Sequence, residues 1–197
     1  MPPEGLRPAD YCAAALDLLA EWGPDGLTIA ALCQRLGVTK GSFYHHFADF
    51  PGFVDTLMAY WAAEHATRLI ALSESIVDAR ERFELLHGIA VGLPHDAEAA
   101  IRAWSWSDQR VAAVVRQVDQ ARLTHLTSAG IEAGLSPERA GLMATISMGV
   151  LIGLQQMERP ASPDTMEAAF AALEQWVFEP AAPLSVASRA EAGAQLR

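Results

Sequence analysis

The side chains best suited to chemistry in this sequence lie in residues 28–47, where polar groups able to contact DNA alternate with apolar ones. Lys40, the only lysine of the 197 residues, offers a positive charge to a phosphate. Gly41 has no side chain, so its helix could approach a duplex closely, and Ser42 can hydrogen bond to a base edge. The outward positions of this predicted helix are Lys40, Gly41, Ser42, His45 and His46.

Two short helices joined by a tight turn are predicted to position these side chains. Thr28 suits the cap of the first helix, and Gly37 suits a left-handed end. Thr39 would cap the second helix, so that both threonines direct hydroxyls and helix N-termini toward phosphates. Arg35, on the exposed side of the first helix, could touch the DNA backbone. The pattern predicts a helix-turn-helix, whose second helix enters the major groove.

An aromatic anchor is expected beneath the second helix, formed by Phe43, Tyr44 and Phe47. Tyr44 has a second possible role, because its hydroxyl could reach phosphates or bases. His45 and His46 could reach the same groups. A metal site at this histidine pair is not favoured, because adjacent helical residues point apart and no third ligand is near in the sequence.

Residues 11–60 resemble the DNA-binding domain of the tetracycline-repressor (TetR) family of bacterial transcriptional regulators. The resemblance is carried by the positions Ala13–Leu19, Gly23, Thr28–Ile29, Leu32, Gly37–Gly41 and Phe43–Phe47. It implies a DNA-binding homodimer with a C-terminal ligand-binding domain, and usually repression of transcription that a small molecule relieves. The closing segments 137–157 and 163–178 would then form a four-helix bundle with their counterparts in a second subunit. Two positions depart from the family pattern: Phe50 replaces a usual lysine, and Cys33 replaces a frequent alanine.

The whole chain is predicted to be all-α, because Ala and Leu abound while β-branched residues are sparse. We expect a helix-turn-helix domain at 1–50, a helical ligand-binding and dimerisation domain at 51–180, and a flexible tail at 181–197. The predicted helices span residues 8–22, 28–36, 39–47, 53–73, 76–91, 96–104, 108–129, 137–157 and 163–178. Ser-Pro pairs mark the starts of the last two helices.

A ligand cavity is expected between the C-terminal helices, where helical bundles build such sites. The residues that could border it are Met58, Trp61, Phe83, His87, Trp104, His125 and Met143. Core packing is an equally good interpretation for any single one of them. Arg122 could serve as a polar group of the pocket or lie at a solvated edge.

The charge of the chain argues against strong DNA binding by one copy. The formal net charge is −10, and residues 1–50 hold three basic against six acidic residues. Because DNA affinity depends largely on phosphate neutralisation, the chain would rely on two copies and on helix N-termini. The alternative function is a helical ligand-binding or protein-interaction homodimer whose DNA affinity is weak or lost.

Several other functions are not favoured by the sequence. No enzyme motif, metal-ligand spacing or cofactor loop stands out, so we expect neither an enzyme nor a cofactor. The most apolar stretch, 140–157, is interpreted as a buried interface helix rather than a membrane span. A cytoplasmic location follows from this, with double-stranded DNA and an unknown small molecule as partners. Cys12 and Cys33 are expected to be reduced, although a disulfide between them stays open.

Overall fold

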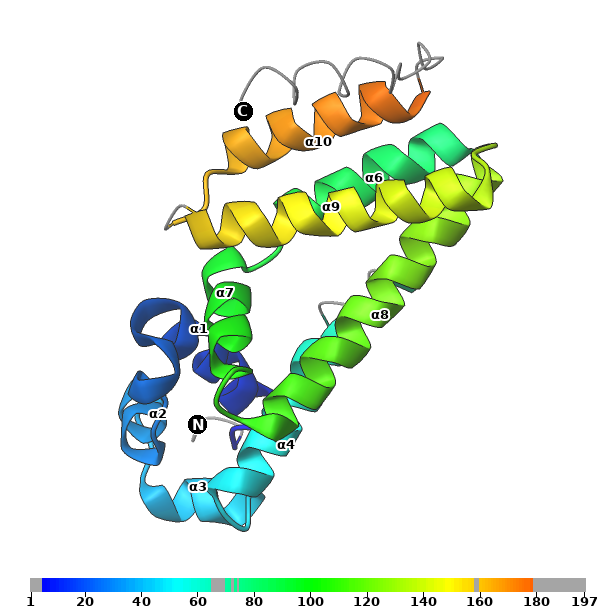
Figure 1. Cartoon of the computed structure of the whole chain (residues 1–197). Helices are drawn as coiled ribbons and strands as arrows, with labels where there is room; N and C mark the ends of the chain where they lie inside the picture. The colour runs from blue at the N-terminus through cyan, green and yellow to red at the C-terminus, as the bar shows by residue number, and fades with distance from the viewer. Residues whose placement is uncertain (1–4, 65–69, 72, 74, 158–159, 179–197) are drawn as a thin grey trace, which may run out of the picture.

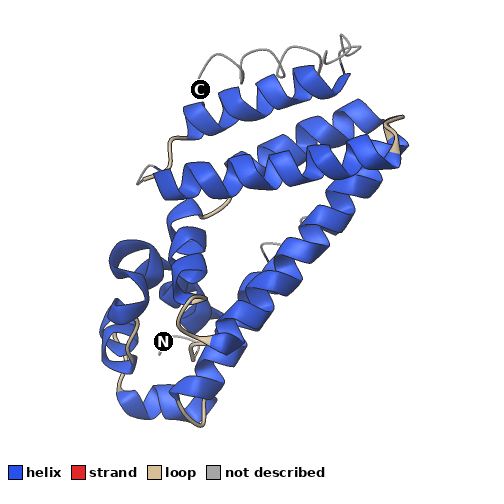
Figure 2. Cartoon of the chain, in the orientation of Figure 1, coloured by secondary structure: helices blue, strands red, loops and turns tan. Residues whose placement is uncertain are grey.

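The structure, a computed structural model, describes residues 5–64, 70–71, 73, 75–157 and 160–178, without the side chains of residues 79, 80, 83 and 178. All regular structure in these ranges is helical, which confirms the all-α prediction (Figure 2). The predicted tail at 181–197 and the middle of the predicted helix 53–73 lie outside the described residues.

The N-terminal part consists of α1 (Pro8–Gly26), α2 (Ile29–Leu36), α3 (Lys40–His46) and α4 (Phe50–Ala62). The first regular helix ends at Trp22 as predicted, because the backbone of Gly23 is non-helical (φ 69°, ψ −170°); a further helical turn after this kink extends α1 to Gly26. The predicted start of α4 at residue 53 is wrong, because the helix begins at Phe50. Asp49 accepts a hydrogen bond from the Gly52 amide at 2.7 Å, and a proline in the first helical turn costs no hydrogen bond.

The remaining elements are α6 (Ala79–Val91), α7 (His95–Trp104), α8 (Gln109–Glu132), α9 (Pro137–Met157) and α10 (Pro163–Phe178). Their bounds agree with the sequence predictions within three residues, and α9 and α10 agree at both ends. Figure 1 shows α8 running from its contact with α4 up to the layer formed by α6, α9 and α10. α7 stands beside α1 and joins it to the same layer (Figure 1).

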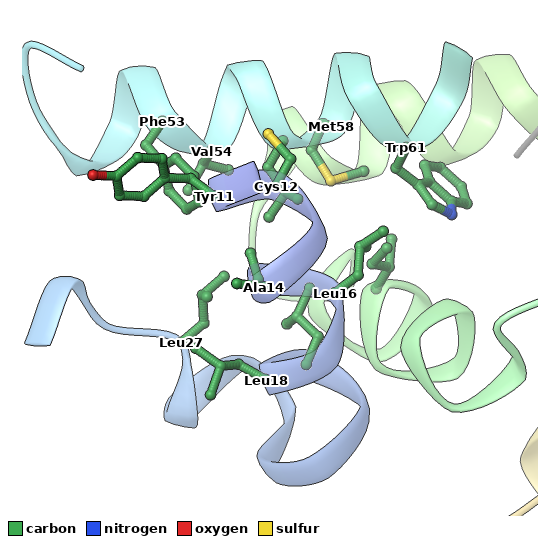
Figure 3. Close-up of a cluster of buried hydrophobic side chains, with 14 of the residues drawn as sticks. Tyr11, Cys12, Ala14, Leu16, Leu18, Leu27, Phe53, Val54, Met58 and Trp61 are labelled. Carbon is green, nitrogen blue, oxygen red and sulfur yellow. The ribbon is translucent and has the colours of Figure 1, made fainter. Parts of the chain in front are cut away.

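The largest hydrophobic cluster of the described residues is shared between the N-terminal helices and the helices α7 and α8. It contains Leu18 of α1, Leu57 of α4, Ile101 of α7 and Val111 of α8, all fully buried. Figure 3 shows Met58 and Trp61 of α4 pointing from that helix into this core. A movement of α7 or α8 should therefore displace α1, because closely packed interiors transmit strain.

Candidate DNA interface and ligand cavity

The turn between α2 and α3 has the geometry that a helix-turn-helix requires. The Thr28 hydroxyl accepts from the Ala31 amide at 3.1 Å, which caps α2 as predicted. Gly37 lies in the left-handed region with φ 66°, and Val38 donates its amide to the Cys33 carbonyl at 2.9 Å. Thr39 occupies the N-cap position of α3, but no hydrogen bond from its side chain caps the helix. Its exposed hydroxyl therefore remains beside the helix N-terminus.

Aromatic rings hold α3 against the rest of the N-terminal part. Phe43 and Phe47 are buried and stack edge-on or tilted against Tyr11 of α1 and Phe53 of α4, with ring centroids 5.0–6.1 Å apart. Tyr44 is not part of the inward anchor, which corrects that expectation. Its side chain is 54% exposed, and its ring lies perpendicular to the Phe43 ring with centroids 5.5 Å apart.

The face of α3 that points away from this anchor carries the predicted contact groups. Lys40, Gly41, Tyr44 and His45 are exposed, while Ser42 and His46 are half-buried. The Ser42 hydroxyl shares a 2.7 Å hydrogen bond with the Tyr11 hydroxyl, and the His46 ring lies 5.5 Å from the Tyr11 ring. Tyr11 thus orients two of the predicted contact residues, a role that the sequence did not reveal.

Arg35, at the end of α2, is held by residues of α1. Its guanidinium donates to the Glu21 carboxylate at 2.6 Å and lies over the Trp22 ring, 5.8 Å from the centroid. Hydrogen bonding to Glu21 raises the pKa of Arg35 above its usual value. Any phosphate that binds Arg35 must therefore compete with this carboxylate, a competition that the sequence did not reveal.

A mainly apolar cavity lies between α6, α8, α9 and α10. It offers about 80 Å³ to the centres of water-sized molecules. Its lining residues are Ile70, Leu86, His87, Ile89, Ala90, Leu93, Arg122, His125, Leu126, Ser147, Met148, Leu151 and Phe170. The cavity lies in the C-terminal helical layer, as the sequence led us to expect.

Two of the predicted ligand residues, His87 and His125, line this cavity. The others do not. Met58, Trp61 and Trp104 pack in the core shared by α1, α4, α7 and α8. Met143 is buried against Ala129 and Val177 beside α8 and α10. For Phe83, the side chain lies outside the described part. Large apolar side chains suit a protein core and a cavity wall equally well, so residue type alone could not distinguish core positions from cavity positions.

A buried polar network adjoins the cavity and joins α6, α7, α8 and α9. Arg122 of α8 binds the carboxylate of Glu98 of α7 through two hydrogen bonds, of 2.6 and 3.2 Å. Gln155 of α9 donates to the same carboxylate at 3.1 Å and to Nδ1 of His95 at 3.2 Å. Nε2 of His95 lies 3.0 Å from the Val91 carbonyl oxygen. The Glu98 side chain, 2% exposed, is therefore compensated by its partners.

This network was not predicted, although one signal was present. Glu98 interrupts the run Ala97, Ala99, Ala100, and a charged residue that such an apolar segment buries is almost always paired. Its partners lie 24 and 57 residues away. A single sequence does not say which distant arginine or amide will meet it.

Residues 12–49 match the family model described as bacterial regulatory proteins, tetR family. Among proteins of known role, the chain is similar to the tetracycline repressor protein class A from transposon 1721 of Escherichia coli. They are 42% identical over 65 residues, which make up 33% of this chain and 30% of that repressor. The chain therefore matches less than a third of the length of this relative.

Solved structures share the fold over most of the chain. A TetR transcriptional regulator from Legionella pneumophila aligns with a TM-score of 0.75 and 11% identity, over 88% of this chain and 98% of that one. A TetR-family transcriptional regulator from Agrobacterium tumefaciens aligns with a TM-score of 0.73 and 21% identity, over 86% and 96%. The arrangement of the C-terminal helices is thus shared, although their sequences have diverged.

Proposed function

We propose that this chain, whose residues 12–49 match the family model of bacterial regulatory proteins, tetR family, is a DNA-binding transcriptional regulator. It acts as a repressor that a small molecule releases from its operator. The single observation that carries this proposal is the exposed face of α3, which presents Lys40, Gly41 and Tyr44. This helix follows a turn in which Gly37 has the left-handed conformation that a helix-turn-helix requires. Residues 1–50 bind DNA in this proposal, and 51–180 bind the effector and the second subunit.

The DNA contacts that we propose come from the caps of α2 and α3 and from the outer side of α3. Lys40 pairs with a phosphate, and Gly41 allows close approach. Ser42, held by Tyr11, faces a base edge at the margin of the buried core. The full set of proposed contact residues is Thr28, Arg35, Thr39, Lys40, Gly41, Ser42, Tyr44, His45 and His46.

A homodimer through α9 and α10 is part of the proposal. Leu142 and Ile146 of α9 and Trp176 of α10 are large apolar side chains exposed in the single chain. A side chain added at Gly149 would meet no other atom of the described chain within 4 Å. α9 is also apolar and long enough for a membrane span, with mean hydropathy 1.3 in its best window. Its packing against α8 and α10 favours a protein interface, and hence a cytoplasmic regulator.

Release from DNA is proposed to proceed by a shift of population. Two recognition helices fit successive major grooves only when they lie about 34–36 Å apart. Glu98 of α7 binds Arg122, which lines the cavity. Ala97 and Ile101 of the same helix belong to the core around α1. A ligand that favours one position of α7 therefore changes the position of α1 and α3. The sequence pointed instead to the helix after residue 53, which is described only in part.

The first experiment is a selection of duplexes from a random library by the full-length chain, followed by salt titration of the enriched duplex. Lys40→Ala should weaken binding several-fold and reduce the slope of log K against log salt by about 0.9 for each phosphate left without its cation. The matched control is Arg116→Ala, which removes an exposed positive charge on α8. It should leave the DNA affinity and the slope of log K against log salt unchanged.

Two results would favour the alternative, a ligand-binding or interaction homodimer without useful DNA affinity. One is the absence of any enriched duplex at low salt. The other is equal DNA affinity of Lys40→Ala and Arg116→Ala. The local excess of acidic residues and Phe50 at the start of α4 are the observations behind this second function.

A further inference from the structure

Among the described residues, each polar side chain that lines the cavity is engaged by another group of the protein. Arg122 binds both oxygens of the Glu98 carboxylate, so its charge is matched within the protein. The Ser147 hydroxyl donates to the Met143 carbonyl oxygen at 2.9 Å, within its own helix. Nε2 of His125 lies 2.6 Å from the Ser73 hydroxyl. The cavity thus offers a ligand few polar groups that are not already used.

His87 is held in a similar way. Its ring stacks on Phe170, with centroids 5.3 Å apart, and its Nδ1 lies 3.3 Å from the Glu174 carboxylate. Burial lowers the pKa of His87, while Glu174 acts in the opposite direction. The His87 ring is thus already engaged by Phe170 and by Glu174.

These contacts disfavour charged ligands of either sign. A carboxylate that bound Arg122 would draw it away from Glu98, whose side chain is 2% exposed and would lose its ionic partner. A cation finds no acidic side chain among the described residues of the lining. The other nine of these described lining residues are Ile, Leu, Ala, Met or Phe. Burying the apolar surface of a ligand against them is favourable, because that surface is removed from water.

We propose that this cavity takes a small, uncharged and largely apolar molecule, of about the size of one substituted ring. The size is inferred from the volume of about 80 Å³ open to the centres of water-sized molecules, which exceeds several-fold the roughly 10–15 Å³ that one water-sized sphere occupies. The inference rests on the proposed function in taking the cavity as the effector site. It adds the chemical class of the effector.

Three probes with one skeleton test the class: 4-ethylbenzyl alcohol, 4-ethylbenzoate and 4-ethylbenzylammonium. We expect the alcohol to bind the full-length chain at least tenfold more tightly than either ion in calorimetric titration. At ten times its Kd, the alcohol should raise Tm by roughly 3–6 °C. Equal or tighter binding of the carboxylate or the ammonium compound would overturn the inference, and so would no binding of the alcohol.

Ala90→Phe places a ring inside the cavity and should reduce binding of the alcohol at least tenfold. Ala113→Phe, on the exposed side of α8, is the control and should leave it unchanged. If Ala90→Phe is unfolded by circular dichroism, Ser147→Leu fills the cavity from α9 instead. Retained binding in a folded cavity variant would place the probe elsewhere and contradict the inference.

DNA binding of the same preparations separates the two proposals. If the alcohol binds in the cavity and no duplex is ever bound, the ligand class stands and the proposed function fails. If a duplex is bound and the carboxylate is the preferred probe, the function stands and the ligand class is wrong.

Discussion

Side chains on the candidate DNA face are held by partners from α1. Ser42 is bonded to Tyr11, and Arg35 is bonded to Glu21. The two partners act differently. Tyr11 is fully buried and supports the helix, whereas the exposed Glu21 carboxylate cancels one of the few positive charges available for phosphates. If Arg35 binds a phosphate as proposed, Glu21 therefore competes with the DNA for it.

Replacing Glu21 by glutamine should strengthen DNA binding. Without the carboxylate at 2.6 Å, the Arg35 guanidinium becomes available to a phosphate. We expect a two- to tenfold lower Kd at low salt and a salt slope steeper by about 0.9 for each further phosphate that is neutralised. Fluorescence anisotropy with the selected duplex measures both quantities.

The control for the change in net charge is Glu81→Gln, an exposed residue in the first turn of α6. It removes the same charge outside the helix-turn-helix and outside the proposed interface of α9 and α10. If Glu81→Gln strengthens binding as much as Glu21→Gln, the effect comes from net charge, and the competition at Arg35 is refuted.

At this scale, the sequence predicts what depends on residue type and near neighbours. The Thr28 cap, the Gly37 turn and the buried Phe43 each follow from local rules, and the structure has all three. The bonds of Ser42 and Arg35 join residues 31 and 14 positions apart. They depend on how α1 packs against α2 and α3, which a local pattern does not specify.

Among the helices, α7 links the two proposed sites most directly. One side packs on α1, and Glu98 on the same helix pairs with Arg122 at the cavity. The charge of Glu98 is buried, so removing one member of the pair leaves the other uncompensated. This makes the pair a sensitive element of the fold as well as a link between the sites.

Glu98→Ala should lower the free energy of unfolding by about 3–5 kcal/mol, because it leaves Arg122 buried without its carboxylate. The double variant Glu98→Ala, Arg122→Met should recover most of this loss. Urea denaturation at a fixed protein concentration measures each variant.

Asp119→Ala is the comparison, because Asp119 forms a similar but more exposed pair with Arg102 between α7 and α8. Its loss should be clearly smaller. A Glu98→Ala variant as stable as Asp119→Ala, or no recovery in the double variant, would show that the buried pair has no special weight.

The helix boundaries show where sequence rules reach and where they stop. Ser136 and Ser162, each followed by proline, predicted the starts of α9 and α10 correctly. Similar residues misled at Asp49, Phe50 and Pro51, which looked like a break. There, Asp49 caps a helix that already includes the proline, and whether such a segment is a loop or a first turn depends on packing of Phe50 and Phe53.

For the whole molecule, the proposed function needs two copies. A single chain with few basic groups binds one half-site weakly, whereas a dimer joins two half-sites in one event and gains affinity from their linkage. The surface that would join the copies is the outer side of α9 and α10, where Leu142, Ile146 and Trp176 are exposed. Dimerisation and DNA affinity should therefore be lost together.

Ile146→Glu tests this dependence. A carboxylate in the centre of the proposed interface would be desolvated without a partner, so we expect the mass in solution to fall from twice 21.2 kDa to 21.2 kDa by light scattering. DNA affinity should fall at least tenfold, while the helical content stays the same.

Val77→Glu, at an apolar residue 95% exposed before α6, is the control and should remain dimeric. If Ile146→Glu is still a dimer, the subunits meet through another surface; if it is a monomer with unchanged DNA affinity, one copy suffices and the two-site mechanism is wrong.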